Sequence, residues 1–159
     1  MNRKCVFAGS FDPVTLGHEY LIAQSLKMFD EVVVAILVNP VKTPAFSIEQ
    51  RMEMLRIALN GEKRIRIVEW KGTVAELLKK ENTPFYVRGI RNTVDFEYEN
   101  ANFFASKRLN ADITPVYLPC PQELLHVSSS MVRSSLQFKT SISDYVSEKV
   151  EEYIMACEA

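Results

Sequence analysis

A loop that is rich in small residues and ends in a histidine is the first segment whose residue types suggest chemistry. The segment Gly9–His18 follows a short apolar run, so we expect a strand to lead through it into a helix. Gly9 is expected to let the backbone turn sharply, and Gly17 to let another group approach the helix closely. His18 would then stand at a helix N-terminus, where free N–H groups and the helix dipole favour a phosphate. Taken alone, the segment fits equally well a plain turn around Asp12 with an exposed histidine.

Two other segments carry groups that suit phosphate. Ser128–Ser130 open a predicted helix, so their hydroxyls and free N–H groups could meet the terminal phosphates of a nucleotide. Arg133 lies three residues later on the same helix face and would add positive charge. Arg88 and Arg91 flank a glycine after a predicted strand, and guanidinium groups bind phosphate oxygens in pairs. Serine caps beside a solvated arginine are common, however, so the serine segment alone does not decide the matter.

The order of these segments resembles that of a known superfamily. Thr15–His18 has the T-x-G-H form of the first nucleotidyltransferase signature, and Val127–Arg133 is similar to the second signature, I-S-S-T-x-x-R. Arg88–Arg91 followed by Asp95–Glu99 resembles the phosphopantetheine adenylyltransferase family within that superfamily. The resemblance extends from Cys5 to about residue 133.

This resemblance implies an adenylyltransferase that transfers AMP from ATP to 4′-phosphopantetheine, giving dephospho-coenzyme A and pyrophosphate. The acceptor phosphate is already an anionic nucleophile near neutral pH, so no general base is needed. Positioning and charge stabilisation would then supply the catalysis. Mg²⁺ is expected to arrive with ATP, because no carboxylate cluster suggests a protein cage. The resemblance also implies a homohexamer and inhibition by coenzyme A.

By the same resemblance, individual residues receive roles. His18 would stabilise charge at the α-phosphate, and Arg91 would bind the β- and γ-phosphates. Ser10, which stands where the family usually has threonine, keeps the hydroxyl expected to orient the acceptor phosphate. The implied catalytic residues are His18, Lys42 and Arg91. The implied phosphopantetheine site is Ser10, Lys42, Val74 and Arg88. The implied ATP site is Ser10, Phe11, His18, Gly89, Ile90, Arg91, Glu99, Leu124, Leu125, His126, Val127, Ser128, Ser129 and Ser130. Within it, His126 has no family role of its own and is expected to be a loop residue.

Two other classes of function remain open at this stage. A related nucleotidyltransferase could adenylate nicotinate mononucleotide or cytidylate glycerol phosphate, but those relatives usually carry H-x-G-H, and Thr15 takes the first position here. A non-catalytic nucleotide-binding module would be favoured by a lost His18, which is present. The sequence lacks Gly-x-Gly-x-x-Gly, which argues against a nicotinamide or flavin enzyme.

Short β-branched runs alternate with helical stretches along the chain. This alternation predicts a single α/β domain over residues 1–159, with a Rossmann-like, doubly wound parallel sheet and helices on both faces. Strands are expected at 3–8, 31–37, 65–70, 85–87 and 113–118. Helices are expected at 18–29, 47–59 and 94–109, and from about 73, 128 and 144 onward, the last two packing on the rest. Ligands of such sheets lie beyond the carboxyl ends of the strands, which is where the segments above fall.

Composition sets broad limits on the function. The chain has 159 residues, 47% of them hydrophobic, which suits one core. A formal net charge of −1 gives no support to a nucleic-acid partner, and no apolar stretch is long enough for a membrane span. Cys5, Cys120 and Cys157 are odd in number and widely spaced, so reduced thiols are expected. The N-terminus reaches Ser10 too early for a signal peptide, and we expect a cytoplasmic protein.

Overall fold

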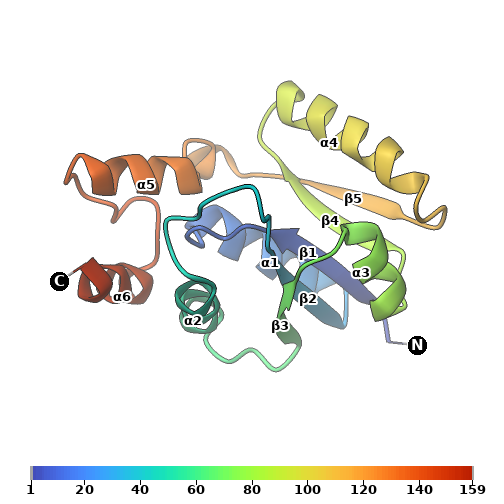
Figure 1. Ribbon diagram of the computed structural model, residues 1–159, viewed down its shortest axis with the longest axis horizontal. Coiled ribbons are helices and arrows are strands. Elements are labelled where there is room, and N and C mark those ends of the chain that lie inside the picture. Colours follow the sequence, from blue (N-terminus) through green and yellow to red (C-terminus); the bar gives the residue numbers. More distant parts are fainter. Residues whose placement is uncertain (1, 159) are drawn as a thin grey trace.

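The computed structural model describes residues 2–158 and contains a five-stranded sheet in the order β3-β2-β1-β4-β5 (Figure 1). All of its neighbouring strands pair in parallel, which confirms the predicted α/β class. The strands are β1 Lys4–Gly9, β2 Glu31–Leu37, β3 Ile65–Trp70, β4 Phe85–Ile90 and β5 Thr114–Pro119.

Six α-helices and one short 3₁₀ helix connect and follow the strands within the described residues. They are α1 Leu16–Met28, α2 Ile48–Leu59, α3 Val74–Glu81, α4 Thr93–Lys107, η1 Gln122–Leu124, α5 Ser129–Gln137 and α6 Glu148–Glu158. Ser47 and Thr73 form the predicted capping boxes of α2 and α3. Across residues 2–158, no helix has the length and apolar character that a bilayer span requires.

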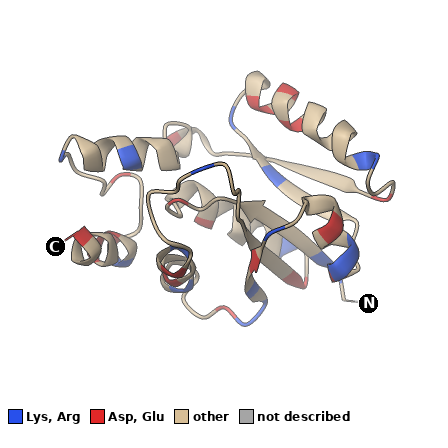
Figure 2. Cartoon of the chain, viewed as in Figure 1, with Lys and Arg blue, Asp and Glu red and all other residues tan. Residues whose placement is uncertain are grey.

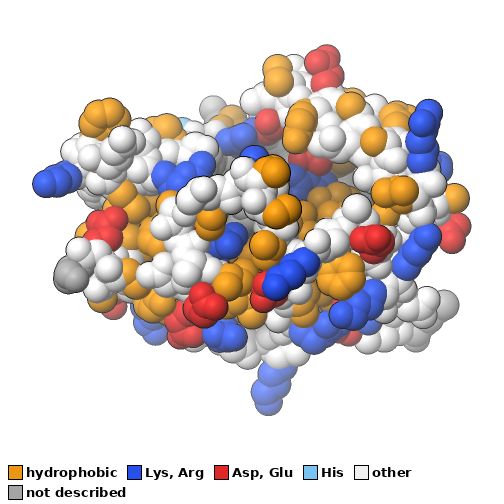
Figure 3. All heavy atoms as spheres, viewed as in Figure 1, with side chains coloured by type: hydrophobic (Ala, Val, Ile, Leu, Met, Phe, Trp, Pro, Cys, Tyr) orange, Lys and Arg blue, Asp and Glu red, His pale blue; other side chains and the backbone are white. Residues whose placement is uncertain are grey.

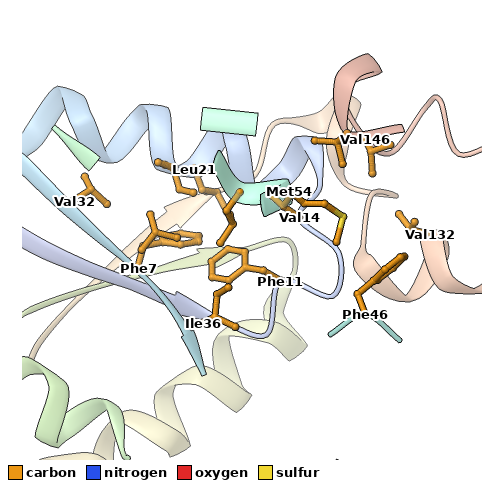
Figure 4. Close-up of a cluster of buried hydrophobic side chains, with 14 of the residues drawn as sticks. Phe7, Phe11, Val14, Leu21, Val32, Ile36, Phe46, Met54, Val132 and Val146 are labelled. Atoms are coloured by element: carbon orange, nitrogen blue, oxygen red, sulfur yellow. The ribbon is translucent and has the colours of Figure 1, made fainter. Parts of the chain in front are cut away.

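The central strands bury side chains on both faces of the sheet. Cys5 and Phe7 of β1 join the core beneath α1 and α2, while Val6 and Ala8 join the core beneath α3. β2 alternates in the same way, because successive side chains of a strand point to opposite faces. Helices on both faces were predicted, and the two cores confirm them. Figure 4 shows Phe7 within the larger core.

The C-terminal helices complete the larger core. Val132 of α5 and both Val150 and Ile154 of α6 are buried in it, as the predicted apolar stripe requires. The Leu16 N–H at the start of α1 donates to the Tyr145 carbonyl oxygen at 2.9 Å. The segment before α6 therefore covers the beginning of α1. The helix α6 itself begins at Glu148, four residues later than predicted.

Two further local predictions were wrong. Gly9 does not make the sharp turn; it still belongs to β1, and the left-handed residue is Phe11, at φ 46°. The second error concerns Arg88, which was expected in a loop but lies in β4. That strand continues to residue 90 because β5 runs alongside it, with Arg88 opposite Tyr117. Short apolar runs do not reveal such pairing, since strand ends depend on the neighbouring strand.

The strand order reverses between β1 and β4, where connections leave in opposite directions. In open α/β sheets a ligand crevice lies at this reversal, beyond the carboxyl ends. Figure 2 shows blue Lys and Arg positions spaced around this edge, on the loop after β2, on β4, before α4 and on α5. These positions correspond to Lys42, Arg88, Arg91 and Arg133.

Candidate active site

The loop after β1 is held by a buried aromatic ring. Phe11 is only 1% exposed, and its ring lies 6.0 Å from that of Phe7 and 4.9 Å from the imidazole of His18. Figure 4 shows the ring pointing into the core beside Ile36. The side chain of this predicted ATP-site residue is therefore a core residue that packs against the imidazole of His18.

Two helices clamp the same loop through its carbonyl oxygens. Arg51 of α2 donates from Nη1 to the Ser10 oxygen at 3.0 Å. From α5, Arg133 Nη1 donates to the Asp12 oxygen and Ser129 Oγ to the Pro13 oxygen, each at 2.7 Å. The loop backbone is therefore fixed from both sides before any ligand arrives.

Asp12 ties this loop to the one that carries Lys42. Its buried carboxylate accepts hydrogen bonds from the backbone N–H groups of Ala45 and Phe46, both at 2.9 Å. The sequence offered Asp12 only as a turn former and gave Arg51 no role. Both residues are functional supports that sequence reasoning missed, since their partners lie 34 and 41 positions away along the chain.

His18 is the third residue of α1 and part of its N-terminal cap. Its Nδ1 accepts a hydrogen bond from the Thr15 N–H at 3.0 Å, while its own N–H donates to Thr15 Oγ1 at 3.4 Å. Burial, reinforced by the positive charges of Arg88 and Arg91, lowers the pKa of His18 to about 4. At neutral pH the imidazole is therefore uncharged and carries its proton on Nε2, as a hydrogen-bond donor.

The serine segment reaches the same loop from the opposite end of the chain. All three hydroxyls have partners inside the protein: Ser128 accepts from the Met131 N–H, Ser129 donates to Pro13, and Ser130 accepts from Arg133. The N–H groups of Ser129 and Ser130 stand in the first turn of α5, where no intrahelical acceptor exists. Phosphate oxygens would therefore meet backbone donors here more readily than hydroxyls.

The residues of the turn before α5 differ in how far they are exposed. Val127 is buried, and its N–H donates to the Leu124 carbonyl oxygen at 3.0 Å. Leu125 is 41% exposed and His126 is exposed too, as expected of a loop residue. The imidazole of His126 lies 6.0 Å from the ring of Tyr145.

Both predicted arginines of β4 and the following turn are held by carboxylates. Arg88 donates from Nη2 to Glu99 and from Nη1 to the Ala8 carbonyl oxygen, each at 2.6 Å. The exposed Arg91 donates from Nε to Asp95 at 3.0 Å. Gly89 lies between these arginines, directly against α1, where a side chain would overlap Leu21. Ile90, the last residue of β4, is half-buried.

Two adjoining cavities open at this edge of the sheet. The first, the α4 cavity, has a volume of about 410 Å³ and is lined by Ser10, Val74 and Arg88 together with one face of α4. The second, the loop cavity, has about 380 Å³ and is lined by Lys42, Arg51 and Arg133. Ser10 lines both cavities, so the structure brings all four predicted phosphopantetheine residues around one continuous region. Figure 3 shows the hollow beneath α4 with charged and apolar side chains at its margin.

The carboxylates near the site are already engaged. Asp12 accepts two backbone N–H groups, Glu99 binds Arg88, and Asp95 binds Arg91. Within residues 2–158 there is also no group of three or more His, Cys, Asp or Glu side chains that could hold a metal ion. The donor set therefore does not fit a metal held by the protein alone.

Comparison with other proteins adds a family to this geometry. Residues 6–135 match the cytidylyltransferase-like family. The phosphopantetheine adenylyltransferase of Dictyoglomus turgidum is 39% identical over 153 residues, covering 94% of this chain and 96% of the relative. That of Caldanaerobacter subterraneus subsp. tengcongensis is 35% identical over 153 residues, covering 96% of both chains.

Solved structures support the fold. A putative nicotinate-nucleotide adenylyltransferase from Vibrio parahaemolyticus superimposes with a TM-score of 0.75 at 21% identity, covering 98% of this chain and 93% of the other. The Plasmodium falciparum nicotinic acid mononucleotide adenylyltransferase complexed with APC also reaches 0.75, at 17% identity, over 99% and 96% of the chains. At such identities the likeness shows the fold alone and leaves the reaction and its acceptor to other evidence.

Proposed function

Since the chain belongs to the phosphopantetheine adenylyltransferase family, we propose that it transfers AMP from ATP to 4′-phosphopantetheine, giving dephospho-coenzyme A and pyrophosphate. One observation supports this acceptor above all: two cavities of different character meet at Ser10. An acceptor with a charged end and a long uncharged arm matches that pair of cavities.

The charge distribution orients the acceptor. In the loop cavity Lys42, Arg51 and Arg133 are cationic, while the carboxylate of Asp12 is already satisfied by backbone N–H groups. In the α4 cavity the charge of Arg88 is balanced by Glu99. We therefore place the acceptor phosphate near Lys42 and Ser10, and its pantetheine arm along Val74 in the α4 cavity.

The ATP phosphates would lie between His18 and the first turn of α5. A phosphate oxygen of the acceptor forms the new bond to the α-phosphorus, and the bond from that phosphorus to the β-phosphate oxygen breaks, releasing pyrophosphate. The Nε2–H of a neutral His18 donates a hydrogen bond to the charge that develops there, with no proton to exchange. Arg91 and the N–H groups of Ser129 and Ser130 would hold the leaving pyrophosphate.

Magnesium enters this proposal as part of the MgATP substrate. The neighbouring carboxylates are taken by N–H groups and guanidinium groups, so the triphosphate itself must supply the ligands. The groups of this chain named above contact the acceptor and the ATP phosphates, and none of them is proposed to contact the metal ion.

Assembly and regulation extend the proposal. The homohexamer implied by the resemblance is supported by α4, none of whose residues is buried within the described chain. Val94, Tyr98 and Phe104 of this helix are 70%, 66% and 60% exposed, which suits a face covered by another copy. Coenzyme A carries the same arm as the acceptor, so we expect it to compete for the α4 cavity.

A pyrophosphate-release assay tests the function directly. The enzyme receives MgATP with phosphopantetheine, nicotinate mononucleotide or glycerol phosphate in separate reactions, and we expect rapid release with phosphopantetheine alone. Lys42→Ala should raise the KM for phosphopantetheine by about tenfold or more, because a hydrogen bond to a charged group is lost. Lys63→Ala, in an exposed loop, serves as the matched control. A preference for either of the other acceptors would overturn the assignment.

A further inference from the structure

Two polar atoms in the wall of the α4 cavity have no hydrogen-bond partner among residues 2–158. They are the hydroxyl of Tyr117 and the Nε of Arg88, and both are buried. Both residues line the cavity assigned above to the acceptor's arm. Buried polar groups in native proteins nearly always have a hydrogen-bond partner. Two such groups without a partner in one cavity wall therefore point to a ligand.

The two atoms come from neighbouring strands at the same level of the sheet. Tyr117 of β5 lies opposite Arg88 of β4 in the strand register. The ring of Tyr117 packs edge-on against Phe96 at 5.5 Å, which fixes its orientation. Burial, with the nearby charge of Glu99, raises the pKa of the Tyr117 hydroxyl, which stays protonated and can donate or accept a hydrogen bond.

Packing alone does not explain a tyrosine at this position. A phenylalanine would keep the contact with Phe96 and would avoid burying an unpaired hydroxyl, which costs free energy. The guanidinium of Arg88 is also only partly paired. Its two Nη groups donate to the Ala8 carbonyl oxygen and to Glu99, while its Nε has no hydrogen-bond partner. The cavity wall therefore offers a ligand two neighbouring groups: the Tyr117 hydroxyl, which can donate or accept a hydrogen bond, and the Arg88 Nε–H, which can donate one.

We propose that Tyr117 is a specificity-determining residue, whose hydroxyl, beside Arg88 Nε, hydrogen-bonds an amide or hydroxyl group in the uncharged arm of the acceptor. This inference rests on the proposed function, because it takes the α4 cavity as the arm's place. A purely hydrocarbon arm would leave both polar atoms unpaired and would bind more weakly.

The test compares Tyr117→Phe with the wild-type enzyme. We expect the KM for phosphopantetheine to rise about fivefold to tenfold, while the KM for ATP stays unchanged. Pantetheine, which has the arm but no phosphate, serves as a competitive inhibitor, and its inhibition constant should rise by the same factor. Tyr153→Phe, which removes a hydroxyl from α6 on the other face, is the matched control and should leave all three constants unchanged.

Stability provides the second measurement. Because the hydroxyl has no partner in the free protein, the unfolding temperature of Tyr117→Phe should equal or exceed that of the wild type. A lower unfolding temperature, or an unchanged KM in an enzyme that does use phosphopantetheine, would overturn the inference. If the wild type fails to use phosphopantetheine at all, the proposed function itself is wrong, and the two failures are thereby distinguished.

Discussion

The loop after β1 and the helix α4 border the same site but are built in opposite ways. The loop is fixed by Arg51, Arg133 and Ser129 from two helices, and its aromatic ring is only 1% exposed in the core. α4 buries no residue in the described chain and exposes Tyr98 and several other large apolar side chains. One border is therefore rigid within a single chain, and the other depends on what binds or covers it.

The difference separates two tasks of the proposed reaction. Transfer of an adenylate needs donors held in place around the reacting phosphorus, and the clamped loop supplies such a frame for His18. Binding a long flexible arm needs surface and a few polar contacts, which α4 and β5 supply. Changes in the loop should therefore affect turnover and stability, and changes along α4 should affect acceptor affinity.

Replacing His18 should have the largest effect. His18→Ala removes the Nε2–H donor proposed for the α-phosphate, and loss of such a donor lowers kcat by about 100-fold or more. Nucleotide affinity, measured by calorimetry, should change much less, and the protein should still fold. His18→Gln keeps an N–H donor and should recover part of the rate. Near-normal turnover of His18→Ala would contradict the proposed role.

Loosening the link between the two loops should come next. Asp12→Asn leaves at least one of the buried N–H groups of Ala45 and Phe46 without its carboxylate, so the free energy of unfolding should fall by roughly 1–3 kcal/mol. The KM for the acceptor should rise as well, because Lys42 lies in the loop that is released. Denaturant unfolding and acceptor kinetics measure the two effects.

The control for this change is Asp144→Asn, at an exposed aspartate, which should alter stability by less than about 0.5 kcal/mol. If Asp12→Asn is as stable as this control and keeps the acceptor KM, the proposal that Asp12 anchors the Lys42 loop is wrong.

The sequence predicted most of the fold because its signals were local. The apolar run of β2 and the capping boxes at Ser47 and Thr73 need only neighbouring residues, and all three were found where expected. The turn at Phe11 was missed because glycine is the usual left-handed residue, whereas here core packing of the aromatic ring favours the strained backbone.

Only part of the site could be predicted, again because the sequence reveals local signals and not distant contacts. Motif residues such as His18, Lys42 and Arg88 could be named from their segments, and the structure gathers them at one edge of the sheet. Their supports could not, since Arg51 and Asp12 act on backbone groups far away in sequence. The sequence likewise gave no sign that all three serine hydroxyls have hydrogen-bond partners inside the protein.

Two glycines allow a paired test at the loop and at β4. Gly89→Ala would place a methyl group into Leu21 and should destabilise the protein by roughly 1–3 kcal/mol. At Gly17 an added methyl meets only Thr15 Oγ1, at 3.6 Å, so Gly17→Ala should be neutral or stabilising by up to about 1 kcal/mol in thermal unfolding. Because Gly17 is predicted to let a ligand approach the helix, its alanine variant should nevertheless lose activity. Full activity of Gly17→Ala would remove that prediction.

The last effect concerns the protonation of His18. Its pKa is about 4 in the folded chain, against about 6.5 in an unfolded one, so protons bind the unfolded state more readily. The resulting stability is fully present above pH 6.5 and is lost as the pH falls toward 4, by roughly 1 kcal/mol at pH 6 and roughly 2 kcal/mol at pH 5. His18→Gln lacks this titration, so its unfolding free energy should fall less over that interval in urea denaturation. A wild-type imidazole that titrates near 6.5 by nuclear magnetic resonance would show that burial and the two arginines do not keep His18 neutral. A proton found on Nδ1 would show that the Thr15 N–H does not leave the proton on Nε2.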